Sequence, residues 1–277
     1  MSDTSTATAP SAAPRAEAPD AAPAGSRGRR VGAAVARWTA AALVCGALGT
    51  GTAYGIASMD RDDVPGLATE SDGRWDYPRL TLPALPEGRQ RPYSDGNRHQ
   101  IHHADLRDLL LPAPAGATVD KGLGGGWVRE SRYLSEYAVE HRAGLRQALA
   151  DYGVRHIAAR GWTMPDGTTT RIHLLRFTAS DAAEEFSQSV IGAGLSPDAA
   201  LVGAPGTRLD ESWEWDELTG PVTLHVYDEV PPVGAGHTRQ AYILAGDTLA
   251  LVTQTRKGAA PAVPFRQTVL LQSQLLG

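Results

Sequence analysis

Residues 154–177 read VRHIAARGWTMPDGTTTRIHLLRF, and this stretch carries the clearest local signal in the chain. Two runs rich in β-branched, aromatic and other apolar residues, 154–163 and 168–177, flank the tetrapeptide MPDG at 164–167. Proline fixes φ at one turn position, and aspartate and glycine accept the conformations that the next positions require. A turn of this composition between two strand-like runs predicts a β-hairpin.

The residues upstream of the hairpin predict two helices joined by a loop. HADLRDLLLP at 103–112 is typical of a short helix that ends at its final proline. KGLGGGW at 121–127 predicts a flexible loop, because neither a Gly-Lys-Ser/Thr sequence nor a strand-turn-helix pattern follows to indicate phosphate binding. Residues 131–151 place tyrosine and leucine at helix-like intervals, which predicts an amphipathic helix.

The residues downstream of the hairpin continue the mixed pattern. Thr178 and Ser180 offer N-caps for a helix that would extend to Val190. A terminal helix is predicted to begin at Pro264. Between these helices, four strand-like runs occur at 208–216, 222–227, 239–244 and 248–255. This order lacks the strict strand and helix alternation of a Rossmann-type sheet, and it predicts an α+β fold with a mainly antiparallel sheet packed with helices.

A resemblance supports this fold class. The run at 145–177, together with DLRDLLLPAPAGA at 105–117, resembles a group of streptomycete membrane proteins to which no activity is assigned. The resemblance covers most of residues 75–277 and implies no functional residues. At the level of the fold, the chain also looks like actinobacterial secreted α/β lipoproteins and kinase sensor domains. Those sensor domains commonly contain disulfides, which this chain lacks.

The N-terminal part predicts a single transmembrane helix ahead of the α+β domain. Residues 38–59 contain no charged side chain and are long enough to cross a hydrocarbon core of about 30 Å. Arginines precede this segment and aspartates follow it, so the amino terminus is expected inside the cell and the carboxyl terminus outside. We therefore expect a disordered cytoplasmic tail at 1–30, a signal anchor at 31–59, a proline-rich linker at 60–98 and an extracytoplasmic domain at 99–277.

Other interpretations of the apolar segment stay open. A cleaved signal peptide would use a site near Gly55-Ile56-Ala57. A lipoprotein would require a small residue before Cys45, where the chain has Val44. Small residues recur every four positions at Ala47, Gly51 and Gly55, which would allow two such helices to pack closely, although an alanine- and glycine-rich composition explains them equally well.

Charge and cysteine content exclude two classes of function. Residues 1–59 carry a net charge of +2, which leaves −7 for residues 60–277 out of the total of −5. Nucleic-acid binding requires a basic face, so the outer domain is a poor candidate for it. Cys45 is the only cysteine, so this domain has neither a disulfide nor a thiolate metal site. We expect no cofactor.

The densest set of metal-ligating residue types lies just before the predicted domain core. The set consists of His99, His102, His103 and Asp105. Imidazole and carboxylate ligands suit Zn²⁺, although no HExxH spacing is present. The competing interpretation is a solvated helix start, where an aspartate is favourable near the positive end of the helix dipole.

A second cluster surrounds two tryptophans and is the candidate ligand-binding site. Its members are Trp213, Glu214, Trp215, Asp216 and the nearby His225. In a strand the tryptophans would share one face and the carboxylates the other. This pattern predicts either a half-buried strand or an aromatic and acidic surface for a saccharide, a cationic peptide or Ca²⁺.

The sequence leaves three functions open. A membrane-tethered, non-enzymatic binding or sensor-like module of the cell envelope, with a protein or saccharide partner, fits the anchor and the missing catalytic motifs. A hydrolase whose site assembles from dispersed Asp, Glu and His residues is the second hypothesis. A structural or assembly factor is the third.

Overall fold

The computed structural model describes residues 27–57, 71–213, 221–231 and 233–277. The chain divides into two units, Met1–Glu70 and Ser71–Gly277, and each is described by itself. The predicted cytoplasmic tail at 1–30 lies almost entirely outside the described residues.

The first unit contains one long helix, α1 (Arg27–Ala57). Among the described residues, no helix is both long enough and apolar enough to cross a membrane. The predicted span at 38–59 is therefore not confirmed. The residue types explain the difference, because α1 is rich in Ala, Gly and Thr, which bury less apolar area than Leu, Ile, Val or Phe.

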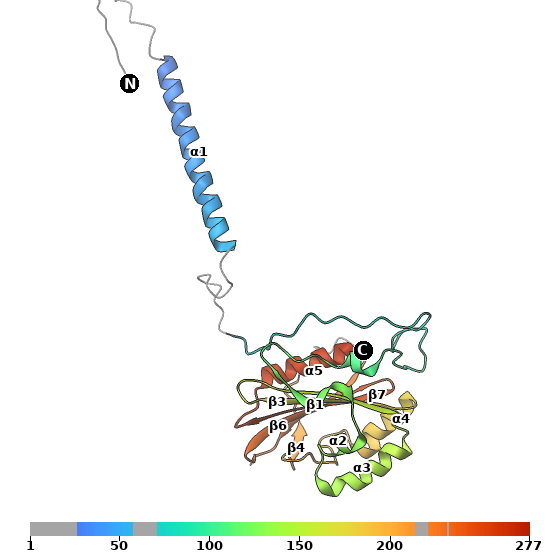
Figure 1. Cartoon of the computed structure of the whole chain (residues 1–277). Helices are drawn as coiled ribbons and strands as arrows, with labels where there is room; N and C mark the ends of the chain where they lie inside the picture. Colours follow the sequence, from blue (N-terminus) through green and yellow to red (C-terminus); the bar gives the residue numbers. More distant parts are fainter. Residues whose placement is uncertain (1–26, 58–70, 214–220, 232) are drawn as a thin grey trace, which may run out of the picture. The chain divides into compact units, whose positions relative to one another are not determined.

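A seven-stranded antiparallel sheet forms the centre of the second unit (Figure 1). Its strands are β1 (Thr118–Trp127), β2 (His156–Thr163), β3 (Thr169–Arg176), β4 (Thr207–Leu209), β5 (Thr223–Glu229), β6 (Gly236–Ala245) and β7 (Thr248–Lys257). The strand order is β1-β2-β3-β7-β6-β5-β4, so strands distant in the chain become neighbours at the middle of the sheet. The predicted α+β class and the antiparallel sheet are confirmed.

The predicted hairpin forms β2 and β3. Thr163 pairs with Thr169 at its closed end. The Asp166 side chain accepts hydrogen bonds from the backbone N–H and the hydroxyl of Thr168, both at 2.9 Å. Gly167 takes a φ of +83°, a conformation that glycine adopts without steric cost. Asp166 and Gly167, which helped to predict the turn, therefore also stabilise it.

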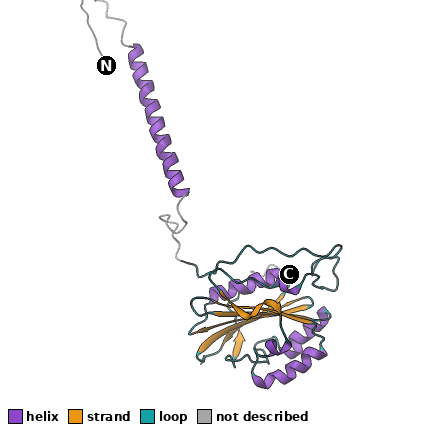
Figure 2. Ribbon diagram, in the orientation of Figure 1, coloured by secondary structure: helices purple, strands orange, loops and turns teal. Residues whose placement is uncertain are grey.

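Helices cover both faces of the sheet (Figure 2). Helix α5 (Ala262–Leu276) covers one face, where its apolar side chains pack over β6 and β7. The other face carries α2 (Glu130–Leu134), α3 (Val139–Asp151), α4 (Ser180–Glu185) and the π-helical turn η3 (Phe186–Val190). Each face has its own buried apolar cluster, which gives the domain two cores separated by one sheet.

Several local predictions are wrong. The helix predicted at 103–112 is only the short 3-10 helix Leu106–Leu109, and the strand predicted at 208–216 ends at Leu209. The glycine-rich segment predicted as a loop lies within the edge strand β1, because its backbone pairs with β2 despite register shifts on either side of Gly124. The helix predicted at 131–151 breaks into α2 and α3. Leu201 pairs with Tyr137 between the two helices, and this long-range contact competes with helix continuity.

Part of the predicted linker packs on the domain. The second unit begins at Ser71, and the segment before the short 3-10 helix η2 (Leu106–Leu109) runs across the α5 side (Figure 1). Gln267 of α5 accepts a hydrogen bond from the Trp75 N–H at 2.8 Å and donates one to its carbonyl oxygen at 2.9 Å. This reciprocal pair fixes the segment to the helix.

Candidate functional site

A pocket of about 780 Å³ opens where β4, β5 and the start of β6 come together. We call it the β5–β6 pocket. It is lined by Arg208, Leu209, Asp210, Glu211, Asp228, Glu229, Val230, Pro231, Val233, His237, Gly258 and Ala259. Its size falls within the range of small-molecule sites, and its lining combines apolar and charged groups as such sites do.

An arginine neutralises part of the acidic wall. Arg239 Nη1 lies 3.0 Å from Asp228 Oδ2 and 3.5 Å from Asp210 Oδ2. Its Nε–H also donates to the Ala260 carbonyl at 3.1 Å. Asp228 and Arg239 are direct partners across β5 and β6, so the strand register brings the pair together. The guanidinium group therefore holds two carboxylates in fixed positions below the pocket.

His237 is engaged at both ring nitrogens. Its Nδ1 accepts a hydrogen bond from the Ala260 N–H at 3.0 Å, so this nitrogen carries no hydrogen. Its Nε2 then carries the hydrogen and donates to Asp228 Oδ1 at 2.7 Å. A general base needs a free lone pair within reach of the substrate. The His237 ring does not offer one.

Glu229 is a buried carboxylate of the pocket that has no cationic partner among the described residues. Its residue surface is only 7% exposed, yet it lines the pocket. Oε2 accepts a hydrogen bond from the Thr238 N–H at 3.0 Å. Among the described residues, no cationic side chain pairs with Glu229 and no donor reaches its Oε1. Burial of an unpaired carboxylate is costly, so this group marks a point where a positive charge would be stabilised.

A smaller pocket of about 400 Å³ lies where β1 ends and β2 begins. The Trp127 ring, which is half exposed, lies 5.1 Å from the His156 ring, measured between centroids. The Arg107 guanidinium lies 5.0 Å from the Trp127 ring centroid. Two groups already contact the aromatic ring, which makes this pocket a weaker candidate for stacking a ligand.

The tryptophan cluster predicted from sequence is resolved in part. Trp213 is buried and packs edge-to-face on Phe265 of α5, with ring centroids 6.3 Å apart, while Arg266 lies over its ring. It belongs to the core and offers no surface platform. Glu214, Trp215 and Asp216 lie outside the described residues.

His225 does not line the β5–β6 pocket. It lies on β5, directly across from Tyr242 of β6. Burial lowers its pKa below the ordinary histidine value. The structure therefore places this predicted ligand-binding residue apart from the pocket lining.

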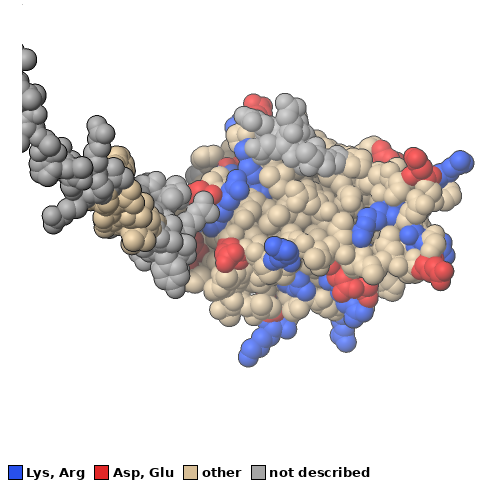
Figure 3. All heavy atoms as spheres, turned by 90° about the horizontal axis from the view of Figure 1, so that it is seen from above, with Lys and Arg blue, Asp and Glu red and all other residues tan. Residues whose placement is uncertain are grey.

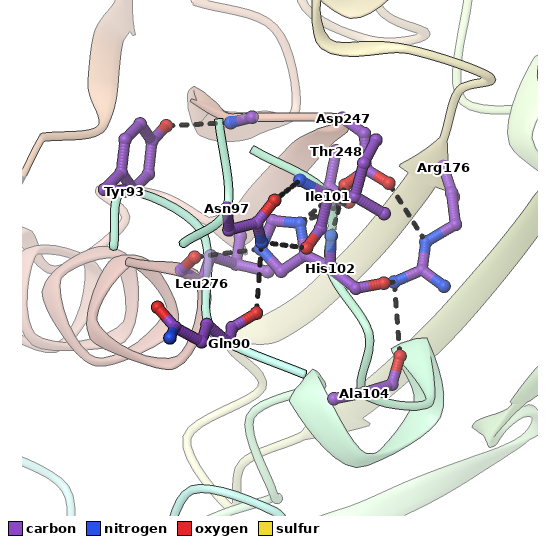
Figure 4. Close-up of polar contacts among 11 residues, drawn as sticks. Gln90, Tyr93, Asn97, Ile101, His102, Ala104, Arg176, Asp247, Thr248 and Leu276 are labelled. Carbon is purple, nitrogen blue, oxygen red and sulfur yellow. Dashed lines mark hydrogen bonds and ion pairs between the residues drawn. The ribbon is translucent and has the colours of Figure 1, made fainter. Parts of the chain in front are cut away.

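His102, predicted as a metal ligand, is instead the centre of a buried hydrogen-bond network (Figure 4). Its Nε2 lies 2.9 Å from the Leu276 carbonyl oxygen, and its Nδ1 lies 2.6 Å from Asp247 Oδ1. Asp247 also accepts hydrogen bonds from the His102 N–H and the Thr248 hydroxyl, and it pairs with Arg176 Nε at 3.6 Å. Both imidazole nitrogens are therefore occupied by protein acceptors.

The other predicted metal ligands do not gather around His102. Asp105 caps η2 and pairs with Arg107 at 2.6 Å, and the hydrogen bond from Arg107 lowers the Asp105 pKa to about 2. Within the described part of the chain, no group of three or more His, Cys, Asp or Glu side chains is arranged to hold a metal ion. The set that is adjacent in sequence is thus dispersed by the fold.

Charges are distributed without a dominant sign on the face of the second unit drawn in Figure 3. Lys and Arg side chains lie scattered among Asp, Glu and uncharged residues. This face has no continuous basic patch of the kind that phosphate backbones require.

Sequence reasoning missed most of the β5–β6 pocket. Its key groups come from β5, from β6 and from the segment at 258–260, which are close only because the strands pair. The alternation of polar and apolar residues at 223–226 was a usable signal for a strand, but not for a pocket. Only the fold shows that Glu229 lacks a cationic partner.

Comparisons with known proteins add little at this point. No protein-family model matches the chain, and no curated protein matches it. Among solved structures, the extracellular domain of PknH from Mycobacterium tuberculosis is similar, with a TM-score of 0.39 and 10% sequence identity. The match covers 64% of this chain and 98% of that one.

Proposed function

We propose that the second unit is a non-enzymatic, extracytoplasmic binding module of the cell envelope, and that the β5–β6 pocket holds its ligand. One observation supports binding over catalysis. Asp210, Asp228, His237 and Arg239 are tied to one another or to the backbone by hydrogen bonds and ion pairs. Such a network fixes the shape and charge of a pocket, and it engages both nitrogens of His237, the residue type that most often serves as a general base.

The hydrolase hypothesis, a site assembled from dispersed Asp, Glu and His residues, stays a prediction. The β5–β6 pocket gathers Asp210, Glu211, Asp228, Glu229 and His237, whereas His225 lies outside the pocket, and Glu214 and Asp216 lie outside the described residues. The assembly-factor hypothesis depends on pairing between copies of α1 and stays a prediction. The binding module is therefore the function we carry forward.

Ligand binding is tested with the purified full chain and a fragment library that contains cationic, anionic and neutral compounds. We expect ligand-observed NMR to detect fragments that bind the parent chain but not the variant Ala259→Trp, whose added ring fills the pocket mouth. The control variant Ala143→Trp adds the same ring to an exposed position of α3 and should bind the same fragments as the parent chain. If no fragment binds, or if bound fragments are indifferent to Ala259→Trp, the pocket is not a ligand site.

The location outside the cytoplasm rests on the charge pattern of the sequence, with arginines before residues 38–59 and aspartates after them. Attachment to the bilayer through this segment is part of the proposal and needs its own test. Protease added to intact spheroplasts should digest the Ser71–Gly277 unit and spare the amino-terminal tail. Digestion of the tail with protection of the unit would reverse the proposed orientation.

A further inference from the structure

We infer that the β5–β6 pocket takes a ligand with an ammonium or guanidinium group on a short apolar stem, and that Glu229 binds the cation. This inference rests on the proposed function, because it names the ligand class of the same pocket. It begins from the buried carboxylate of Glu229, whose Oε2 is held by the Thr238 N–H while Oε1 has no donor among the described residues.

The cost of burying Glu229 predicts that the ligand is positively charged. An ionised carboxylate loses hydration when it is buried, and the protein normally returns that energy through a cationic partner or several N–H donors. Glu229 has one backbone donor and no cationic partner in the described part of the chain. A ligand cation that reaches Oε1 would supply the missing interaction, and a ligand anion would face an unscreened negative charge.

The charges around Glu229 point the same way. Four carboxylates contribute to the wall or floor, and two guanidinium groups, Arg208 and Arg239, stand against them. Arg239 is already shared between Asp210 and Asp228. Arg208 is exposed at the rim and makes no ion pair with a described residue. The pocket therefore keeps an excess of negative charge after its internal pairs are formed.

The apolar part of the lining defines the rest of the ligand. Val230 and Val233 are 40% and 44% exposed, and Pro231 and Ala259 line the same pocket. Exposed valines beside a buried carboxylate suit a stem of a few methylene groups that ends in a cation. Burial of each methylene contributes about 0.8 kcal/mol, so the stem adds affinity that a bare ammonium ion would lack.

The donor set does not suit a metal ion. Nowhere in the described residues do three or more His, Cys, Asp or Glu side chains converge on one point. His237 has both ring nitrogens engaged, and the Asp228 oxygens are directed at His237 and Arg239. Because no such group converges, Glu229 fits a hydrogen-bonding organic cation better than a divalent ion, which requires several oxygen ligands.

Four matched probes test the inference on the purified full chain: n-butylammonium, n-butylguanidinium, butyrate and n-butanol, at constant ionic strength. We expect ligand-observed NMR titrations to give millimolar affinities for the two cations, as suits ligands of so few atoms. Butyrate and butanol should bind at least about ten-fold more weakly, because they cannot form the charge-assisted hydrogen bond. Equal binding of butyrate or butanol would overturn the inference.

Two variants assign the effect to Glu229. Glu229→Gln keeps an acceptor for the Thr238 N–H and removes the charge, so it should weaken cation binding about ten-fold or more. Val230→Lys places a cation at the pocket and should abolish it by repulsion. Glu140→Gln makes the same charge change at an exposed position of α3 and should leave affinity unchanged. Circular dichroism and thermal unfolding confirm that each variant is folded.

The outcomes separate this inference from the proposed function. If the fragments that lose binding in Ala259→Trp are all anionic or neutral, the pocket still binds ligands, but the inference of a cationic ligand is wrong. If the cations bind and Glu229→Gln has no effect while the protein stays folded, Glu229 is not the recognition group. If no compound of any charge binds, the proposed function itself fails.

Discussion

Two histidines, His102 and His173, are buried, but within the described structure only His102 has hydrogen-bond partners for its ring nitrogens. His102 is 4% exposed, and both of its ring nitrogens face acceptors, Asp247 and the Leu276 carbonyl (Figure 4). His173 lies on β3 and is fully buried, and neither ring nitrogen has a hydrogen-bond partner in the described structure. Its nearest carboxylate oxygen, Glu136 Oε1, is 4.0 Å away, too far for a hydrogen bond.

The contrast shows what each ring contributes. A carbonyl oxygen only accepts, so His102 Nε2 carries a hydrogen, and a second hydrogen must lie between Nδ1 and Asp247 Oδ1. This network ties the segment before η2 to the β6–β7 turn and to the end of α5. His173 makes only ring contacts, such as the edge-to-face one with Tyr133, and burial together with Arg132 and Arg171 lowers its pKa to about 3. His173 is therefore neutral and replaceable, whereas replacing His102 would break its hydrogen bonds to Asp247 and Leu276.

Removing the charge partner of His102 should have the largest effect. Asp247→Ala leaves His102, Arg176 and the Thr248 hydroxyl without their shared acceptor. Loss of one side of a buried pair costs about 3–5 kcal/mol, and we expect the upper end here because several donors lose their acceptor at once. Urea denaturation measures the free energy of unfolding. A loss below about 1 kcal/mol would show that the network contributes little.

The pH dependence of stability should reveal His173 next. In the unfolded chain its imidazole titrates near the ordinary histidine pKa of 6.5, while in the folded protein it stays neutral down to about pH 3. Between these values the unfolded state binds one more proton, so this group's contribution to stability is intact above pH 6.5 and is lost as pH falls. The loss should reach about 3 kcal/mol at about pH 4.

The variant His173→Leu isolates this contribution. Leucine removes two unpaired polar atoms, so at about pH 7 the free energy of unfolding should stay within about 1 kcal/mol of the parent chain. Stability of the variant should then fall less steeply between about pH 6.5 and 4 than that of the parent. Parallel pH profiles for the two proteins would show that His173 does not titrate as described.

How far the sequence predicts these features depends on the range of the interactions. The β2–β3 hairpin was predictable because Pro165, Asp166 and Gly167 act within one turn. The His102–Asp247 pair was not, since its members are 145 positions apart and meet only through the packing of the domain. Proximity in sequence also misled the metal hypothesis, which grouped His99 and Asp105 with His102, although His102 bonds Asp247, Asp105 pairs with Arg107 and His99 is exposed. Pairing across strands, as at Asp228 and Arg239, requires the register of the whole sheet.

A hydroxyl cluster near His173 tests whether polar groups on that face contribute more than the histidine does. Tyr137 bonds Tyr133 at 2.6 Å and Tyr242 at 3.2 Å through the three hydroxyls, all of them buried. Tyr137→Phe removes the central hydroxyl and should cost about 1–2 kcal/mol, because two partners are left short of a hydrogen bond. Urea denaturation of Tyr137→Phe beside His173→Leu compares the two directly. A smaller cost for the tyrosine than for the histidine would contradict the ranking.

The smallest effect is expected where the chain places a histidine in water. His99 is exposed and makes no hydrogen bond or ion pair with a described residue, whereas His102, three positions later, is buried in the network. His99→Ala should change the free energy of unfolding by less than about 0.5 kcal/mol, as is usual for surface positions without such contacts. A cost comparable to that of Asp247→Ala would mean that the histidines before η2 act together. In that case the burial of His102 between two acceptors would not explain why it alone, among the three histidines before η2, contributes to stability.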